Sequence, residues 1–154
     1  IQLHTVSREY TVNRPIEEVF EFFCNAENLE LLTPSDLNFR ILTPLPIIMR
    51  KGTLIDYRIT LSGIPFSWQT EITEWQPPCR FVDRQLKGPY KIWIHEHLFT
   101  ARGNETTVTD NVEFRSKGWI FEPLIYRFFV KKRLDRILDY RQSKFKTIFQ
   151  EVTQ

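Results

Sequence analysis

The chain has 154 residues, of which 42% are hydrophobic and 26% are charged. These proportions are those of an average soluble domain, and the length predicts a single domain over residues 1–154. The net charge of +2 lacks the strongly basic face typical of nucleic-acid-binding proteins, so we expect no nucleic-acid partner. The 13 Phe, 5 Tyr and 4 Trp residues are many for this length and suit a core that also lines a cavity.

The two cysteines, Cys24 and Cys79, form neither a CxxC pair nor a zinc-ligand spacing. Together with the lack of a recognisable secretion segment, they indicate a reducing, cytoplasmic compartment. No stretch approaches the ~18 uninterrupted apolar residues of a membrane span. There is no Gly-rich phosphate loop and no Gly-x-Ser-x-Gly nucleophile elbow, so we expect no cofactor and no serine-hydrolase chemistry.

The N-terminal part of the chain predicts one strand and two short helices. Residues 2–12 alternate weakly, which favours a strand. Pro15 suits the first position of a helix, and helical spacing of apolar residues continues through Cys24. A second short helix is predicted for residues 26–32. We expect both helices to pack on a sheet.

The middle of the chain predicts about six strands joined by short turns. Residues 55–61 alternate and are followed by a turn at Ser62–Pro65; this register pairs Ile59 with Trp68. A hairpin is predicted for residues 80–86 and 91–101. Gly103–Asn104 is a two-residue turn signal that leads into a strand at 105–116. Strands joined by such short turns form an antiparallel sheet.

The last part of the chain predicts a long helix from about 119 to 150. Leu134, Leu138 and Phe145 recur with helical spacing and are expected to face the sheet. The opposite, solvated side is expected to carry the basic residues Lys131, Lys132, Arg133, Arg136, Arg141, Lys144 and Lys146. A helix of this kind buries its apolar stripe on the concave face of the sheet.

This order of elements resembles the helix-grip fold of the START/birch-pollen-allergen superfamily, also called SRPBCC. The resemblance is sharpest at Arg14–Phe20, Arg80–Tyr90 and Trp93–Phe99. The last two segments look like a bacterial subgroup related to polyketide cyclase/dehydrase-like and coenzyme Q-binding proteins. The resemblance implies an α+β fold, with a curved antiparallel sheet of about six or seven strands wrapped on the C-terminal helix. It also implies a deep cavity for apolar molecules between the two.

Alternation places an unusual polar set on the inner face of this sheet. Counting outward from the Gly103–Asn104 turn pairs His97 with Asp110, and His95 with Val112. The neighbouring inner positions are aromatic, with Trp93 opposite Phe114 and Phe99 opposite Val108. His95, His97 and Asp110 are therefore expected to point inward.

Three interpretations of these polar residues remain open. They form a buried structural network, since buried polar groups find partners, or they anchor the polar end of an apolar ligand. In the third, His95 and His97 with a carboxylate hold a metal ion. This third interpretation lacks a third histidine and a recognisable second-shell partner, so no metal is expected.

The inner face of the preceding strands supplies the remaining candidate ligand contacts. Asp83 and Gln85 face inward if the loop after Leu86 has three or five residues, and we favour this because the other parity buries two arginines. Aromatic and polar positions predicted to line the cavity, each with plain core packing as the alternative, are Tyr57, Trp68, Thr70, Phe81 and Trp93.

The predicted function is binding of a small hydrophobic or amphipathic ligand, such as a lipid, an isoprenoid or quinone, or a polyketide-like aromatic. The alternative is a cyclase or dehydratase in which His95 or His97 moves protons while Asp110 orients it. Residues 44–50 contain the apolar stretch Pro44–Met49 followed by Arg50. They form a flap, a transient membrane contact or a buried connection, and the sequence leaves these alternatives open, as it does the oligomeric state.

Overall fold

A computed structural model describes residues 3–118 and 129–151. Its seven strands form one antiparallel sheet in the order β1-β7-β6-β5-β4-β3-β2. The strands are β1 (His4–Val12), β2 (Arg40–Ile41), β3 (Leu54–Leu61), β4 (Ile64–Gln76), β5 (Arg80–Lys87), β6 (Tyr90–Arg102) and β7 (Glu105–Ser116). The helices are α1 (Ile16–Cys24), α2 (Asn28–Leu31), the 3-10 turn η1 (Ser35–Leu37) and α4 (Lys131–Glu151).

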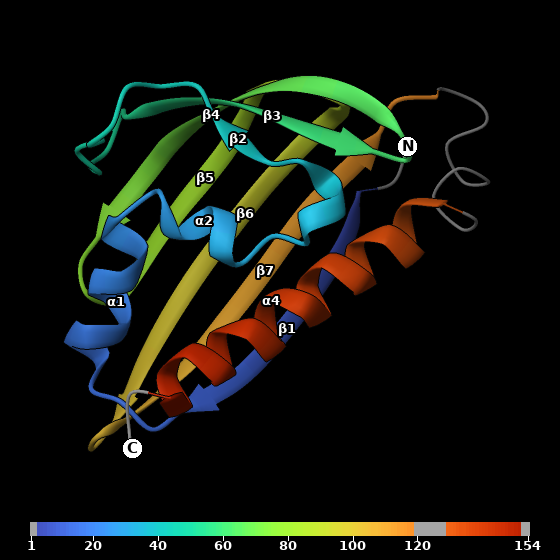
Figure 1. The fold of residues 1–154 in the computed structure, drawn as a ribbon. Coiled ribbons are helices and arrows are strands. Elements are labelled where there is room, and N and C mark those ends of the chain that lie inside the picture. The colour runs from blue at the N-terminus through green and yellow to red at the C-terminus, as the bar shows by residue number, and fades with distance from the viewer. Residues whose placement is uncertain (1–2, 119–128, 152–154) are drawn as a thin grey trace.

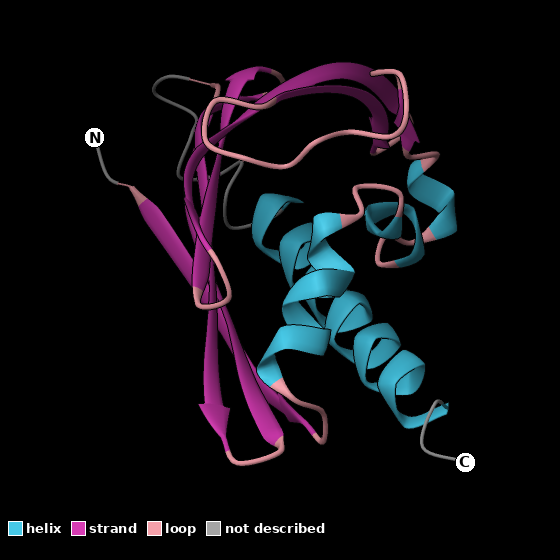
Figure 2. Ribbon diagram, turned by 90° about the vertical axis from the view of Figure 1, so that its left-hand side faces the viewer, coloured by secondary structure: helices cyan, strands magenta, loops and turns pink. Residues whose placement is uncertain are grey.

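The sheet curves around the helices, which all lie on its concave face. Figure 2 shows the strands bending over α1, α2 and α4, and Figure 1 shows α4 running beside β1 and β7. The α+β helix-grip prediction is therefore confirmed, including the two short N-terminal helices. The η1 turn and the two-residue strand β2 were not predicted, since such short elements carry too few residues to show a period.

The predicted apolar stripe of α4 faces the sheet. Leu134, Leu138 and Phe145 are buried, whereas Lys132 and Arg136 are exposed. The prediction was wrong for Arg141, which is 8% exposed and lies on the buried side. The predicted helix residues 119–128 lie outside the described residues.

The predicted register of the β3–β4 hairpin was wrong by two residues. Leu61 pairs with Ile64 and Tyr57 with Trp68, so the turn contains only Ser62 and Gly63. Both turn residues have positive φ (51° and 78°), as a two-residue type I′ turn requires. The sequence indicated a longer turn because Pro65 lies beside it. A shift of two keeps every side chain on its face, so the inner residues are unchanged.

The registers that build the site were predicted correctly. His97 pairs with Asp110, His95 with Val112 and Trp93 with Phe114. Asp83 pairs with His95 across β5 and β6, which confirms the expected inner face of Asp83, although only Gly88 and Pro89 lie between the two strands. These pairs place the polar residues and their aromatic neighbours on the concave face.

The buried apolar residues form two groups along this face. One group lies between α1, β5–β7 and the C-terminal half of α4, and includes Phe20, Phe23, Phe81 and Phe145. The other surrounds Trp68, Tyr90, Val112, Phe114 and Leu134. The polar residues of β6 lie where the two groups meet.

Candidate functional site

Five charged or polar side chains meet on the concave face, and we call them the polar cluster. They are Asp83 of β5, His95 and His97 of β6, Asp110 of β7 and Arg141 of α4. Asp83 is the most accessible, with its side chain 20% exposed, and the other four are at most 10% exposed.

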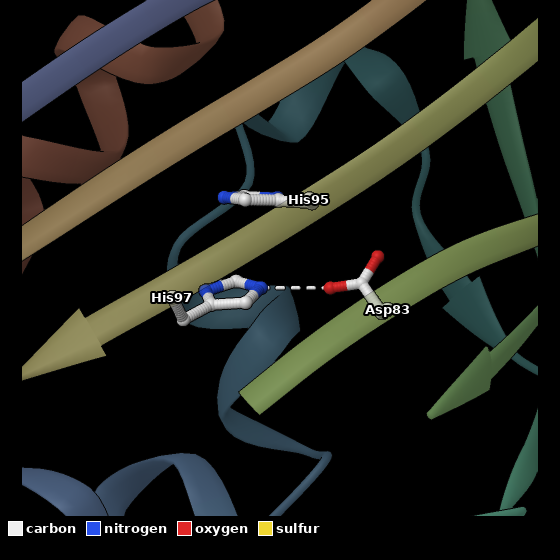
Figure 3. Close-up of side chains that lie close together, drawn as sticks. All are labelled: Asp83, His95 and His97. Carbon is white, nitrogen blue, oxygen red and sulfur yellow. Dashed lines mark hydrogen bonds and ion pairs between the residues drawn. The ribbon is translucent and has the colours of Figure 1, made fainter. Parts of the chain in front are cut away.

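His97 is held between a carboxylate and a guanidinium. Its Nε2 lies 2.7 Å from Asp83 Oδ2 (Figure 3). Its Nδ1 lies 3.2 Å from a terminal nitrogen of Arg141. Because arginine only donates, Nδ1 of His97 accepts this hydrogen bond. Nε2 is then the protonated nitrogen and donates to Asp83, which makes His97 a neutral imidazole.

His95 is the residue that hydrogen-bonds Asp110, although the strand register sets His97 opposite it. His95 Nε2 lies 2.9 Å from Asp110 Oδ1, whereas His97 Nδ1 lies 3.4 Å from the same oxygen. The predicted His97–Asp110 contact is thus the longer of the two. Arg141 also approaches this oxygen, at 3.7 Å. Asp110 therefore faces both histidines and the arginine.

The charges in the polar cluster are mutually dependent. Burial acts to raise the pKa of Asp110, but Arg141 and the hydrogen bond from His95 outweigh it and hold the pKa well below its usual range. Burial likewise opposes ionisation of Asp83, and the hydrogen bond from His97 lowers its pKa overall. Burial and the neighbouring His97 lower the pKa of His95. Both carboxylates are therefore ionised at neutral pH and His95 is neutral.

Aromatic rings hold the two histidines in place. The His97 ring stacks on Phe81 with centroids 4.0 Å apart, and on His95 with centroids 3.8 Å apart. Trp93 meets the His95 ring edge-on at 6.3 Å. Arg141 lies over the ring of Phe23, 5.4 Å from its centroid. This packing fixes the ring planes of both imidazoles.

The other predicted ligand contacts separate into different places. Tyr57 and Trp68 stack with centroids 5.5 Å apart and both line a pocket of about 460 Å³ that also includes Leu42, Pro44 and Lys87. Thr70 is buried and donates to a backbone carbonyl of β5.

Gln85 closes the turn between β5 and β6. Its amide nitrogen donates to the carbonyl of Tyr90, and its amide oxygen accepts from the Tyr90 N–H. A Cβ atom on Gly88 would overlap this side chain, so a larger residue there would displace Gln85. The amide of Gln85 is thereby occupied within the turn.

Arg141 is the site residue that the sequence analysis missed. Its position follows Leu138 by three residues and precedes Phe145 by four, which puts all three on one helical stripe. A basic residue inside an apolar stripe is a signal of a buried charge with a partner. The sequence analysis placed Arg141 on the solvated side because it is basic, although its position lies on the apolar stripe.

Protein stability is expected to rise with pH through the titration of His95. The pKa of folded His95 lies below the unfolded value near 6.5, so the unfolded chain binds the proton first as pH falls. Stability is fully present above pH ~6.5 and declines below it. Melting temperatures from pH 5.0 to 7.5, in the presence of a chelator, measure this slope. In His95→Gln the slope should be reduced; an identical slope in both proteins contradicts the assignment.

This chain is similar to known proteins in its three-dimensional structure and not in its sequence. No protein-family model matches the sequence, and no curated protein matches it. The aromatase/cyclase Zhui from Streptomyces sp. R1128 aligns with a TM-score of 0.79 over 99% of this chain and 97% of that chain, at 14% identity. A START superfamily protein from Mycobacterium smegmatis aligns with a TM-score of 0.73 over 97% and 99%, at 14% identity.

A plant protein has the same architecture. Ginseng major latex-like protein 151 from Panax ginseng aligns with a TM-score of 0.67 over 96% of this chain and 97% of that chain, at 12% identity. Identities this low establish the fold and leave activity to be argued from the site. The chain therefore has the helix-grip fold of the START/birch-pollen-allergen (SRPBCC) superfamily.

Proposed function

We propose that this protein binds a small amphipathic molecule on the concave face, between the sheet and α4, with the polar cluster anchoring the polar end. The observation that carries the proposal is a buried, charged cluster set into an aromatic wall, with Asp83 partly accessible. Ligand sites combine mostly apolar walls with a few well-placed polar groups. The aromatic rings beside the cluster supply the apolar surface.

A purely structural role accounts poorly for so many buried charges. Replacing a buried ion pair by apolar side chains of similar volume is often neutral or stabilising, so burial of charge is weakly explained by stability. Asp110 and Arg141 are both buried here in addition to two histidines. Such a group is better explained by recognition of a polar partner.

A second observation supports a ligand near Trp68. Its indole N–H is buried and has no hydrogen-bond partner among the described residues. Buried N–H groups almost always have a partner, so an acceptor atom from outside the described residues, such as a ligand oxygen, fits this place. Asp83, in turn, accepts hydrogen bonds. A molecule with both a hydroxyl and a carbonyl or ether oxygen, such as a quinol, a polyketide-like phenol or a lipid alcohol, meets both requirements.

Native mass spectrometry of the protein purified from its own host tests this proposal. We expect a fraction of the protein to carry a bound small molecule that organic extraction releases for identification. The same molecule, added back, should bind the wild type and bind Asp83→Leu at least about tenfold more weakly, because a buried hydroxyl then loses its acceptor. Equal affinity in both proteins contradicts the anchoring role.

Enzymatic turnover is the second candidate, favoured by the two histidine–carboxylate pairs. A carboxylate that holds an imidazole in one orientation makes it an effective acid or base. His95 with Asp110, or His97 with Asp83, can therefore move a proton in a cyclisation or dehydration. If so, His95→Gln or His97→Gln should bind a candidate polyketide normally but lose turnover by about 10²-fold or more.

We also propose that the protein works in the cytoplasm and approaches membranes through residues 44–50. None of the described helices has the length and hydropathy to cross a bilayer. Leu45 and Ile48 are 48% and 75% exposed, and exposed Arg50 and Lys51 follow them. Met49, by contrast, packs on the core, so the stretch is only partly a buried connection.

The membrane proposal predicts a loss of vesicle binding when Ile48 is replaced by serine. Flotation with vesicles containing phosphatidylserine measures the bound fraction, which we expect to fall at least about threefold because apolar area leaves the interface. Ile64→Ser is the matched control, since Ile64 is 57% exposed at the distant β3–β4 turn. Equal binding by the two variants, or no binding by the wild type, refutes membrane contact through this loop.

A further inference from the structure

Asp83, His95 and His97 bring three possible metal ligands together from two adjacent strands. One ligand atom of each lies within 4.8 Å of those of the other two, and the two imidazole rings lie one above the other beside the carboxylate (Figure 3). Two imidazole nitrogens and one carboxylate oxygen are the donor set of many transition-metal sites. We propose that these residues bind one divalent first-row transition-metal ion, with Asp110 orienting both histidines.

Asp110 supplies the partner that the sequence did not reveal. Metal-binding histidines usually give their second ring nitrogen to a carboxylate or carbonyl, which fixes the ring and its tautomer. His95 Nε2 donates to Asp110 Oδ1 at 2.9 Å, so Nδ1 of the neutral His95 ring is unprotonated and carries a lone pair. His97 Nδ1 lies 3.4 Å from the same oxygen, and its Nε2 faces Asp83. Each ring thus has one nitrogen toward Asp110 and one nitrogen for a metal.

The separation of the ligand atoms suits a metal after a small adjustment. Ligands at about 2.0–2.2 Å from an ion and at right angles around it lie roughly 3 Å apart. His97 Nε2 and Asp83 Oδ2 are 2.7 Å apart around a shared proton. When a metal ion replaces that proton at Nε2, the neutral imidazole of His97 carries its proton on Nδ1, which then donates to Asp110 instead of accepting from Arg141. This pair must therefore open by a few tenths of an ångström, and the His95 nitrogen must approach the ion, since the three ligand atoms lie within 4.8 Å of one another and not within 3 Å.

The charge of the polar cluster favours a cation. Asp83 and Asp110 carry two negative charges, Arg141 carries one positive charge, and the histidines are neutral, so the cluster has a net charge of −1. Arg141 lies on the Asp110 side of His97, 3.2 Å from Nδ1, so its positive charge is not at the nitrogen that faces Asp83. Asp83 is also the member with the most exposed side chain, which gives an ion a way in.

Cobalt and zinc titrations of tag-free, chelator-stripped protein test the proposal. We expect one Co²⁺ per chain with visible d–d absorption bands, displaced by one Zn²⁺ in calorimetry. Asp83→Asn removes a charged ligand and still accepts the hydrogen bond from His97, so it should fold and bind at least about tenfold more weakly. His4→Gln is the matched control: it also removes one of the three histidines, but outside the cluster, and should leave the affinity unchanged.

Imidazole NMR of the wild type gives an answer that does not depend on a variant folding. On addition of Zn²⁺, the ¹⁵N signals of His95 Nδ1 and His97 Nε2 should shift, while those of His4 should not. Failure of the folded wild type to bind one equivalent, shifts confined to His4, or equal affinity of Asp83→Asn and wild type each overturn the proposal. The metal site does not depend on the amphipathic ligand, so neither result decides the other.

Discussion

Replacing Leu138 by aspartate is expected to lower the free energy of unfolding by more than about 3 kcal/mol. Leu138 is 4% exposed in the middle of the α4 stripe. The substitution removes a buried leucine side chain, which alone costs about 2–5 kcal/mol. It also buries a negative charge, which is costly unless a cation pairs with it. The effect follows from the way in which α4 closes the concave face.

Urea denaturation monitored by circular dichroism measures this loss. Ser143→Asp is the matched control, because Ser143 is exposed on the same helix and the new side chain is the same. We expect the control to differ from wild type by less than about 0.5 kcal/mol. Near-equal stability of Leu138→Asp and Ser143→Asp would show that α4 does not cover the sheet.

The part of the site that the sequence predicted depends on one turn. Gly103–Asn104 permits a two-residue connection, so counting outward fixed which residues of β6 and β7 face each other and which face inward. The β3–β4 turn lacked an equally clear signal, because Ser62 takes a positive φ that is uncommon for serine. The predicted register there was shifted by two residues, and an even shift leaves each side chain on the predicted face of the sheet.

The hydrogen-bond partners within the polar cluster could not be derived from register. Register pairs Asp83 with His95 and Asp110 with His97, yet each carboxylate makes its short hydrogen bond to the other histidine. Diagonal neighbours on a sheet lie within reach of long side chains, so rotamers and packing choose among them. Stacking on Phe81 sets the ring of His97, and no pattern in the sequence specifies that contact.

The contribution of α4 was equally hidden, because it depends on how the helix lies against the sheet. Periodicity placed Leu138 and Phe145 on the buried stripe but did not show that Asp110 lies opposite the position between them. Only a known docking of helix on sheet identifies Arg141 as the cation of the site. A charged residue in register with an apolar stripe is therefore worth testing as a buried partner in other helix-grip sequences.

Replacing Arg141 by methionine is expected to lower the free energy of unfolding by about 3–5 kcal/mol at pH 7, as removal of one partner from a buried ion pair does. Methionine fills a similar volume, so the loss reports mainly the uncompensated charge of Asp110. Asp110→Asn in the Arg141→Met background should recover most of it, since the remaining amide still accepts from His95. Lys144→Met, at a half-buried position of α4, is the matched control and should change stability little.

The ion pair of Arg141 and Asp110 also makes the loss of stability in Arg141→Met depend on pH. Arg141 and the histidines hold the pKa of folded Asp110 well below its usual range, against burial. The stabilisation from ionised Asp110 is therefore present above its unfolded pKa near 3.9 and is lost as pH falls through the lower folded pKa. In Arg141→Met the carboxyl group takes up its proton at a higher pH, which relieves the unpaired charge. The stability difference between wild type and Arg141→Met should thus be smaller at pH 3 than at pH 7, and a difference independent of pH would assign Arg141 a packing role alone.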